Sequence, residues 1–174
     1  MVRTIYEGRV VSLRIERVTL PNGATVDLEL MDHKGASAVA AVDEARRVVL
    51  IRQYRHAAGG YIWELPAGIL ATADEAPVAC AARELREEVG LTARELRHLG
   101  SVFTTPGFCN ERIHLFLARG LEQVGHARDD DEVIAETREV PLDEALRMVH
   151  RGEIVDAKTI IGLELAAAAV PEAA

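Results

Sequence analysis

The residues most capable of chemistry are three glutamates within Arg83-Glu84-Leu85-Arg86-Glu87-Glu88-Val89-Gly90-Leu91. On a helix, Glu84 lies three residues before Glu87 and four before Glu88, so the carboxylates share one face. Such like charges repel each other by roughly 0.2–0.5 kcal/mol per pair on an exposed helix. A Mg²⁺ ion reverses that sign, because it prefers oxygen ligands and is commonly held by one or two carboxylates plus substrate phosphates. The spacing is therefore compatible with a divalent-cation site for a phosphorylated small molecule.

The competing interpretation is a solvated helix face on which the charges do nothing but face water. In that case Arg83 pairs with Glu87 on the same face, and Arg86 pairs elsewhere. Glu-rich helices of this ordinary kind are common, so spacing alone leaves both interpretations open.

The glutamates must be positioned by a helix, which the pattern predicts over Glu75–Val89. Its apolar stripe consists of Val78, Ala82, Leu85 and Val89, which lie four, three and four residues apart. Gly90 follows as a C-terminal stop. Because the carboxylates would occupy a neighbouring face, we expect them at the edge of the packed surface, where a groove could form.

The rest of the chain reads as strands and two further helices. Polar and apolar residues predict a hairpin over 8–33, strands over Ala36–Val42, Arg47–Gln53, Leu96–Phe103, Ile113–Leu117 and 133–140, and helices over Leu142–His150 and from near Asp156. Strands and helices mix without regular alternation. The fold class is therefore α/β of the α+β kind, with a mixed sheet and helices packed on its faces.

The helix segment resembles the Nudix box, which reads Gly, five residues, Glu, seven residues, then Arg-Glu-aliphatic-x-Glu-Glu-x-Gly-aliphatic. Gly68 and Glu75 supply the first two positions, and 83–91 matches in full. With each residue type near 6% of usage, five fixed positions match by chance roughly once per million starting points. One departure is that six residues separate Gly68 from Glu75, which leaves Asp74 as a possible substitute for Glu75.

The resemblance implies a Nudix α/β/α sandwich and a set of site residues. Metal ligands would be Glu84 and Glu88, with Glu87 as a ligand or close by through water, and the backbone carbonyl of Ala67. Glu87 would also belong to the catalytic group, as would Arg83, which would orient the glutamates by ion pairing. The cofactor would be Mg²⁺ or possibly Mn²⁺, which neutralises a diphosphate and helps to deprotonate the attacking water.

Other segments resemble the ADP-ribose and sugar-nucleotide branch of that superfamily. In that branch, a strand ends in an arginine that contacts a phosphate of the substrate, and Arg55 matches this arginine. Without the resemblance, the simpler interpretation of Arg55 would be a surface salt bridge. Trp63 and Glu64 stand in a matching Trp-Glu-Leu-Pro-Ala-Gly segment, and Trp63 fits base stacking or the core about equally well. Pro106 and Glu111 match a Pro-Gly loop followed by a glutamate.

An acidic loop, Asp129-Asp130-Asp131-Glu132, is by type a solvated turn. In the relatives implied by the resemblance, a glutamate from this loop serves as general base or extra metal ligand. Glu132 is our choice, and Glu136 is the alternative because the match slips by one residue beyond this point.

The resemblance also divides the chain. Residues 1–35 would form a β-hairpin subdomain exchanged across a homodimer, and residues 36–174 the hydrolase domain. A two-stranded unit buries little by itself, which makes a partner physically reasonable.

Net charge, hydropathy and cysteine content limit the kinds of partner and the compartment that we expect. A net charge of -8 and a pI of about 5.3 argue against nucleic acid, which requires a concentrated basic surface. No apolar run reaches the roughly 20 residues that span a membrane, and no secretory signal opens the chain. Cys80 and Cys109 form no framework, so we expect reduced thiols in the cytoplasm.

The expected activity is hydrolysis of ADP-ribose to AMP and ribose 5-phosphate. Another nucleoside diphosphate sugar, such as GDP-mannose, is the close alternative on the same residues. A Nudix module that senses a nucleotide without cleaving it is the alternative from a different class.

Overall fold

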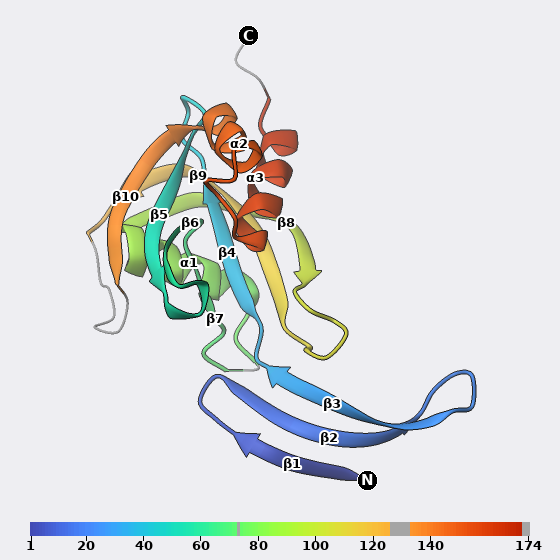
Figure 1. Cartoon of the computed structure of the whole chain (residues 1–174). Helices are drawn as coiled ribbons and strands as arrows, with labels where there is room; N and C mark the ends of the chain where they lie inside the picture. The colour runs from blue at the N-terminus through green and yellow to red at the C-terminus, as the bar shows by residue number, and fades with distance from the viewer. Residues whose placement is uncertain (73, 126–132, 172–174) are drawn as a thin grey trace.

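The computed structural model describes residues 1–72, 74–125 and 133–171, and it consists of a body and an N-terminal arm (Figure 1). The arm is an antiparallel sheet of β1 (Val2–Glu7), β2 (Val11–Thr19) and β3 (Thr25–His33), in that order. The predicted hairpin was therefore incomplete, because it missed β1. All six residues of β1 are exposed, so the strand lacks the alternation that marks a half-buried one.

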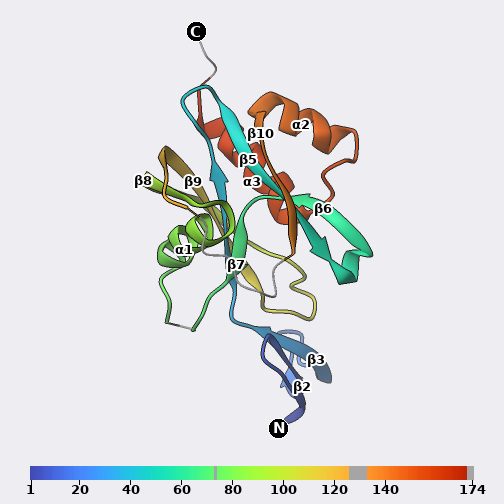
Figure 2. The ribbon, with the colours of Figure 1, turned by 90° about the vertical axis from the view of Figure 1, so that its left-hand side faces the viewer.

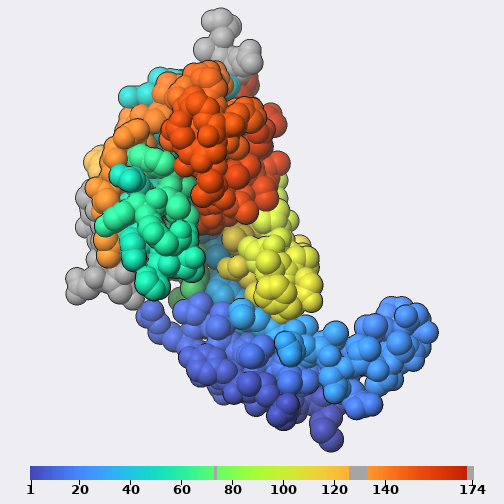
Figure 3. All heavy atoms as spheres, in the orientation of Figure 1, coloured from blue at the N-terminus to red at the C-terminus, as the bar shows by residue number. Residues whose placement is uncertain are grey.

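The arm meets the body along β3 and a loop near residue 108. The N–H of Met31 donates to the carbonyl of Phe108 at 2.7 Å, and the N–H of Asn110 donates to the carbonyl of Met31 at 3.2 Å. The side chain of Asn110 accepts from the N–H of His33 at 2.7 Å. Figure 3 shows this loop resting on the arm, whose β2–β3 end projects beyond the body.

The first sheet of the body is mixed, as expected. Its order is β7 (Ala67–Ile69), β4 (Ala36–Ala41), β9 (Arg112–Gln123) and β8 (Leu91–Phe103), and only β4 and β9 pair in parallel. The long β8–β9 ladder continues well beyond the apolar segments that the sequence identified as strands.

A second sheet accompanies it, so the predicted single sheet is in fact two. Its antiparallel order is β10 (Ile134–Pro141), β5 (Arg47–Arg55) and β6 (Gly60–Glu64). A short 3₁₀ turn, His56–Ala58, joins β5 to β6. Both β6 and β7 were missed, because they are short and stand on either side of Pro66.

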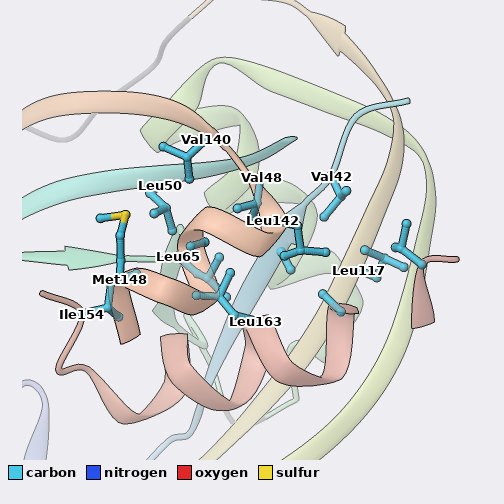
Figure 4. Packing of buried hydrophobic residues seen from close by; sticks show 14 residues of the cluster. Val42, Val48, Leu50, Leu65, Leu117, Val140, Leu142, Met148, Ile154 and Leu163 are labelled. Carbon is cyan, nitrogen blue, oxygen red and sulfur yellow. The ribbon is translucent and has the colours of Figure 1, made fainter. Parts of the chain in front are cut away.

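Helices cover the sheets on opposite sides, as Figure 2 shows. α1 (Pro77–Val89) lies on one side, while α2 (Leu142–His150) and α3 (Ala157–Ala169) lie on the other. One hydrophobic cluster joins Leu50 and Leu65 to Leu142 and Leu163 beneath α2 and α3 (Figure 4). Another cluster gathers under α1. The helix–sheet–helix layering matches the predicted sandwich.

The phase of α1 corrects the sequence analysis. Val78 is 43% exposed and Ala82 is exposed too, so the predicted stripe was wrong for both. The buried residues are instead Cys80, Ala81, Glu84, Leu85, Glu88 and Val89. Glu84 and Glu88 therefore lie within the packed face rather than at its edge. Burial of these carboxylates is possible because polar partners beneath the helix receive them.

Candidate active site

A cavity of about 790 Å³ lies between the arm and the body. Its walls are formed by the arm and the residues that follow β3, by the end of β5, by β7 and the loop after it, and by α1. The segment around Glu111 and the start of α3 complete them. The lining residues are Arg9, Val10, His33, Lys34, Ala36, Gln53, Tyr54, Arg55, Ala67, Gly68, Ile69, Leu70, Ala71, Arg83, Glu84, Glu87, Thr104, Glu111, Ile113, Val133, Asp156, Ala157 and Lys158. A volume of this size suits a small organic ligand.

One wall is the backbone turn that enters β7. The carbonyl of Pro66 accepts from Val39 at 2.9 Å, and the N–H of Ala67 donates to Glu88 Oε2 at 2.8 Å. A Cβ on Gly68 would stand 2.0 Å from Glu84 Oε1, closer than any side chain allows. A side chain at this position would displace the Glu84 carboxylate, so the glycine that opens the box leaves the space that this carboxylate occupies.

Arg83 is the centre of an ion-pair cluster. Its guanidinium lies 2.5 Å from Glu84, 3.0 Å from Glu87 and 3.4 Å from Glu75. Burial alone would lower the pKa of Arg83, but the charge of Glu84 and the hydrogen bonds to Glu87 and Glu75 raise it. This arginine therefore stays charged and fixes the direction of the carboxylates around it.

The burial of the glutamates decides between the two interpretations of the helix face. Glu88 is 0% exposed and Glu84 is 4% exposed, which excludes a solvated face. Carboxylates are rarely buried to this degree unless they are paired with a cation or accept hydrogen bonds. Glu87 retains 27% exposure of its side chain and, with Glu84, lines the cavity.

The donor set fits a divalent cation that the substrate helps to hold. No group of three acidic, histidine or cysteine side chains within the described residues forms a closed cage for an ion. Mg²⁺ does not need such a cage, because one or two carboxylates plus phosphates and waters complete its shell. Glu84 and Glu87 line the cavity and could supply those carboxylates, whereas Glu88 does not line it and instead accepts the N–H of Ala67.

Arg55 is the second charged group that lines the cavity, whereas its partner Glu64, also predicted to bind substrate, lies behind it and does not line the cavity. Glu64 is 2% exposed, and its Oε2 lies 2.7 Å from Arg55 Nη2 and 3.0 Å from Nε. Burial would lower the pKa of Arg55, yet the hydrogen bond to Glu64 and its charge raise it. Arg55 is thus a cation held at the cavity wall, where it can face a phosphate.

Lys158 is the functional candidate that the sequence analysis missed. Its Nζ lies 3.1 Å from Glu64 Oε1, and the side chain is 11% exposed. A faint signal existed, because the chain has only two lysines, Lys34 and Lys158. No local pattern could connect this lysine to Glu64, which lies in a distant part of the sequence.

The structure brings only part of the predicted substrate set into the cavity. Glu111 lines it and accepts from Thr104 Oγ1 at 2.9 Å. Pro106 does not line it and belongs instead to the turn that supports the arm. Trp63 packs against the core, with the guanidinium of Arg138 4.7 Å from its ring centroid. This placement favours the core role for Trp63 in the single chain.

The two candidates for the loop base have different positions. Glu132 lies outside the described residues, although Val133, which follows it, lines the cavity. Glu136 lies on β10, where its carboxylate is 2.6 Å from Arg138, and it does not line the cavity.

The extra residue before α1 leaves Glu75 in the cluster. Its carboxylate accepts from the N–H of Ala71 at 2.6 Å and lies 3.4 Å from Arg83. Asp74 is exposed. Glu75 therefore needs no substitute.

Neither described cysteine is suited to nucleophilic chemistry. Cys80 and Cys109 are both buried and free. Burial, with the negative charge of Glu84, raises the pKa of the Cys80 thiol to about 11. This shift disfavours the thiolate at Cys80, and neither cysteine lines the cavity.

Fold and site together define the class to which the molecule belongs. The profile of the NUDIX domain matches residues 31–161, and the chain belongs to the NUDIX family. Members of this family generally use a divalent metal ion. None of the helices in the described part of the chain is long and apolar enough to span a membrane.

Individual proteins similar to this chain include pyrophosphatases that act on nucleotide sugars by name. The chain is 43% identical over 161 residues to an ADP-ribose pyrophosphatase of Mycobacterium tuberculosis, covering 92% of this chain and 78% of that protein. It is 38% identical over 161 residues to an ADP-ribose pyrophosphatase of Bacillus subtilis, with 92% and 86% covered. A GDP-mannose pyrophosphatase of Klebsiella pneumoniae is 35% identical over 170 residues, with 92% and 78% covered. The solved structure of an ADP compounds hydrolase shares the fold, with a TM-score of 0.81 at 23% identity over 95% of this chain and 89% of that one.

Proposed function

We propose that this protein hydrolyses the diphosphate bond of ADP-ribose to give AMP and ribose 5-phosphate, with Mg²⁺ as the resident metal. The observation that carries the proposal is one cavity lined by two acidic side chains, the buried Glu84 and the partly exposed Glu87, and by the cation Arg55. A diphosphate with a bound divalent ion needs both kinds of side chain. Relatives named ADP-ribose pyrophosphatase support the choice of nucleotide sugar.

The residues would divide the work between metal and substrate. A divalent ion, when bound, would neutralise the diphosphate and acidify the attacking water. Glu84, Glu87 and Glu88, with the carbonyl of Ala67, would hold it. In the described geometry, Glu88 also fixes the N–H of Ala67, and so aligns the backbone that carries the carbonyl.

The remaining predicted residues would act on the nucleotide and on water. Arg55, fixed by Glu64, would bind a phosphate oxygen, and Glu111 would face the rest of the substrate. Glu132 would accept a proton from the attacking water, with Glu136 in reserve. Trp63 and Pro106 stay in the proposed substrate set only if a second chain or a rearrangement brings them to the ligand.

The proposal includes a homodimer with exchanged arms, residues 1–35, and a cytoplasmic location. The wholly exposed strand β1 supports the first, and two free cysteines support the second. Light scattering of the purified protein tests the dimer, and fractionation of the source cells tests the location.

The deciding experiment compares ADP-ribose, GDP-mannose and a dinucleotide polyphosphate as substrates of the purified protein with Mg²⁺, and identifies the products chromatographically. We expect ADP-ribose to be preferred and AMP to be released. A strong preference for GDP-mannose, which some relatives process by name, would overturn the substrate assignment.

The metal site is tested separately by Glu84→Gln and Glu88→Gln. Each should lower kcat by about 100-fold or more while the protein remains folded, because each removes a charge proposed to hold the ion. Tight nucleotide binding without turnover in the wild-type protein would favour the sensing module instead.

A further inference from the structure

We propose that Asp156, Lys158 and Thr159, at the start of α3, form a clamp that positions the segment Glu64–Ala67, and through it Arg55, for diphosphate binding. Lys158 is thereby a positioning residue. This inference rests on the proposed function, since it concerns the same cavity.

The first part of the clamp is a backbone connection. The N–H of Leu65 donates to Thr159 Oγ1 at 2.9 Å, and Thr159 Oγ1 in turn donates to Asp156 Oδ2 at 2.6 Å. The same Asp156 oxygen accepts the N–H of Thr159 at 2.9 Å and so caps α3. Thr159 is 0% exposed, so water does not compete for these bonds. The start of the helix and the turn before Ala67 are therefore one hydrogen-bonded unit.

The second part is a charge connection. Lys158 Nζ lies 3.1 Å from Glu64 Oε1 and 3.0 Å from Asp156 Oδ2. The other Glu64 oxygen is held by Arg55 at 2.7 Å. Glu64 thus lies between two cations: Lys158 contacts mainly its Oε1 atom and Arg55 mainly its Oε2 atom. If Lys158 were neutral, Arg55 would become the sole cation on this buried carboxylate and would turn further toward it, away from the cavity.

Close packing of the helix supports both connections. A Cβ on Gly162 would stand 2.5 Å from a methyl carbon of Leu65, so α3 approaches this turn as closely as a glycine allows. This contact and the Leu65–Thr159 hydrogen bond tie the position of the turn before Ala67 to that of α3. The clamp acts on two groups of the proposed site, the phosphate-binding guanidinium and the carbonyl that would face the metal.

The kinetic test compares Lys158→Met with Lys158→Arg and a surface control on the same helix, Glu164→Gln. Lys158→Met should raise KM for ADP-ribose about tenfold with kcat nearly unchanged, because binding of the phosphate weakens in ground and transition states alike. Lys158→Arg should recover most of the loss, and Glu164→Gln should match the wild type. A lower melting temperature with an unchanged KM would overturn the proposal.

A double-mutant cycle distinguishes positioning from direct contact. Because Lys158 is proposed to act through Arg55, adding Lys158→Met to an Arg55→Gln background should change KM less than about twofold. Multiplicative effects would mean that Lys158 binds substrate by itself, and would overturn the positioning role.

A measurement without substrate separates failure of the clamp from failure of the proposed function. In protein labelled with ¹⁵N-lysine, the ammonium of Lys158 should give a slowly exchanging resonance, whereas exposed Lys34 should not. The resonance should be lost in Glu64→Gln. If it survives that change unaltered, the clamp is refuted, whatever the substrate proves to be. If it behaves as expected while ADP-ribose is not cleaved, the clamp stands and only the substrate assignment fails.

Discussion

Gly68 shows how a single missing side chain shapes the site. The Glu84 carboxylate occupies the space that a Cβ at this position would need, with Oε1 only 2.0 Å away. Glu84 cannot retreat easily, because Arg83 holds it at 2.5 Å within the packed face of α1. A single added carbon atom at residue 68 would therefore disturb the proposed metal site.

We predict that Gly68→Ala lowers kcat by about 100-fold, because a displacement of roughly 1 Å at a catalytic group can have that effect. The measurement is the initial rate over a range of Mg²⁺ concentrations. Gly60→Ala is the matched control, since a Cβ there has nothing within 4 Å. Equal rates for the two variants would contradict the close approach seen here.

His114 provides a pH-dependent prediction away from the cavity. Burial, with the positive charges of Arg112 and His98, lowers the pKa of His114 below its ordinary 6.5. The unfolded chain therefore binds more protons in this range, so the free energy of unfolding should fall as the pH falls below 6.5. His114→Asn should flatten this slope in urea titrations, and an NMR titration should show His114 with the lower pKa. A His114 pKa above 6.5 would refute the assignment.

At the scale of elements, the phase of α1 decides which glutamates are buried. Leu85 is 0% exposed under this helix, whereas Val78 is 43% exposed. The sequence pattern alone placed both residues on the same packed stripe. The difference arises because the helix turns Glu84 and Glu88 inward, toward the Ala67 turn and Arg83.

We predict that Leu85→Ala reduces the free energy of unfolding by about 2–5 kcal/mol, as expected for a buried leucine. Val78→Ala should cost less than about 0.5 kcal/mol, because its side chain already contacts water. Urea unfolding of the two variants measures both. Similar losses would restore the stripe that the sequence suggested.

At the scale of the whole molecule, the arm has apolar side chains that no other part of the described structure covers. Val2, Ile5 and Tyr6 of β1 are 58%, 46% and 59% exposed. Among the described residues, only the loop near residue 108 joins β3 to the body by backbone hydrogen bonds. An exposed apolar edge strand of this kind is a surface on which a second chain can pack.

We predict that Ile5→Glu shifts the protein toward the monomer, because it places a charge on the surface proposed to meet a partner. Light scattering should give twice the 19.0 kDa chain mass for the wild type and the single mass for the variant. Val124→Glu is the control, since Val124 is 52% exposed on the body. A monomeric wild type would refute the exchanged-arm dimer.

Much of the fold and the centre of the site could be predicted from the sequence. The three glutamates, the helix that carries them, its stop at Gly90, and the α2 boundaries are all encoded by spacing within a few turns of chain. Such patterns can be recognised in the sequence because residues three and four apart lie on the same face of a helix. The mixture of strands and helices likewise fixed the fold class.

Only the tertiary structure decided which way those elements face and what they meet. It revealed β1, turned Glu84 and Glu88 inward, kept Trp63 and Pro106 out of the cavity, and joined Lys158 to Glu64. Leu65 and Thr159 are 94 residues apart, yet one hydrogen bond connects them. Local periodicity carries no information about such pairs, because their contact depends on how whole sheets and helices pack.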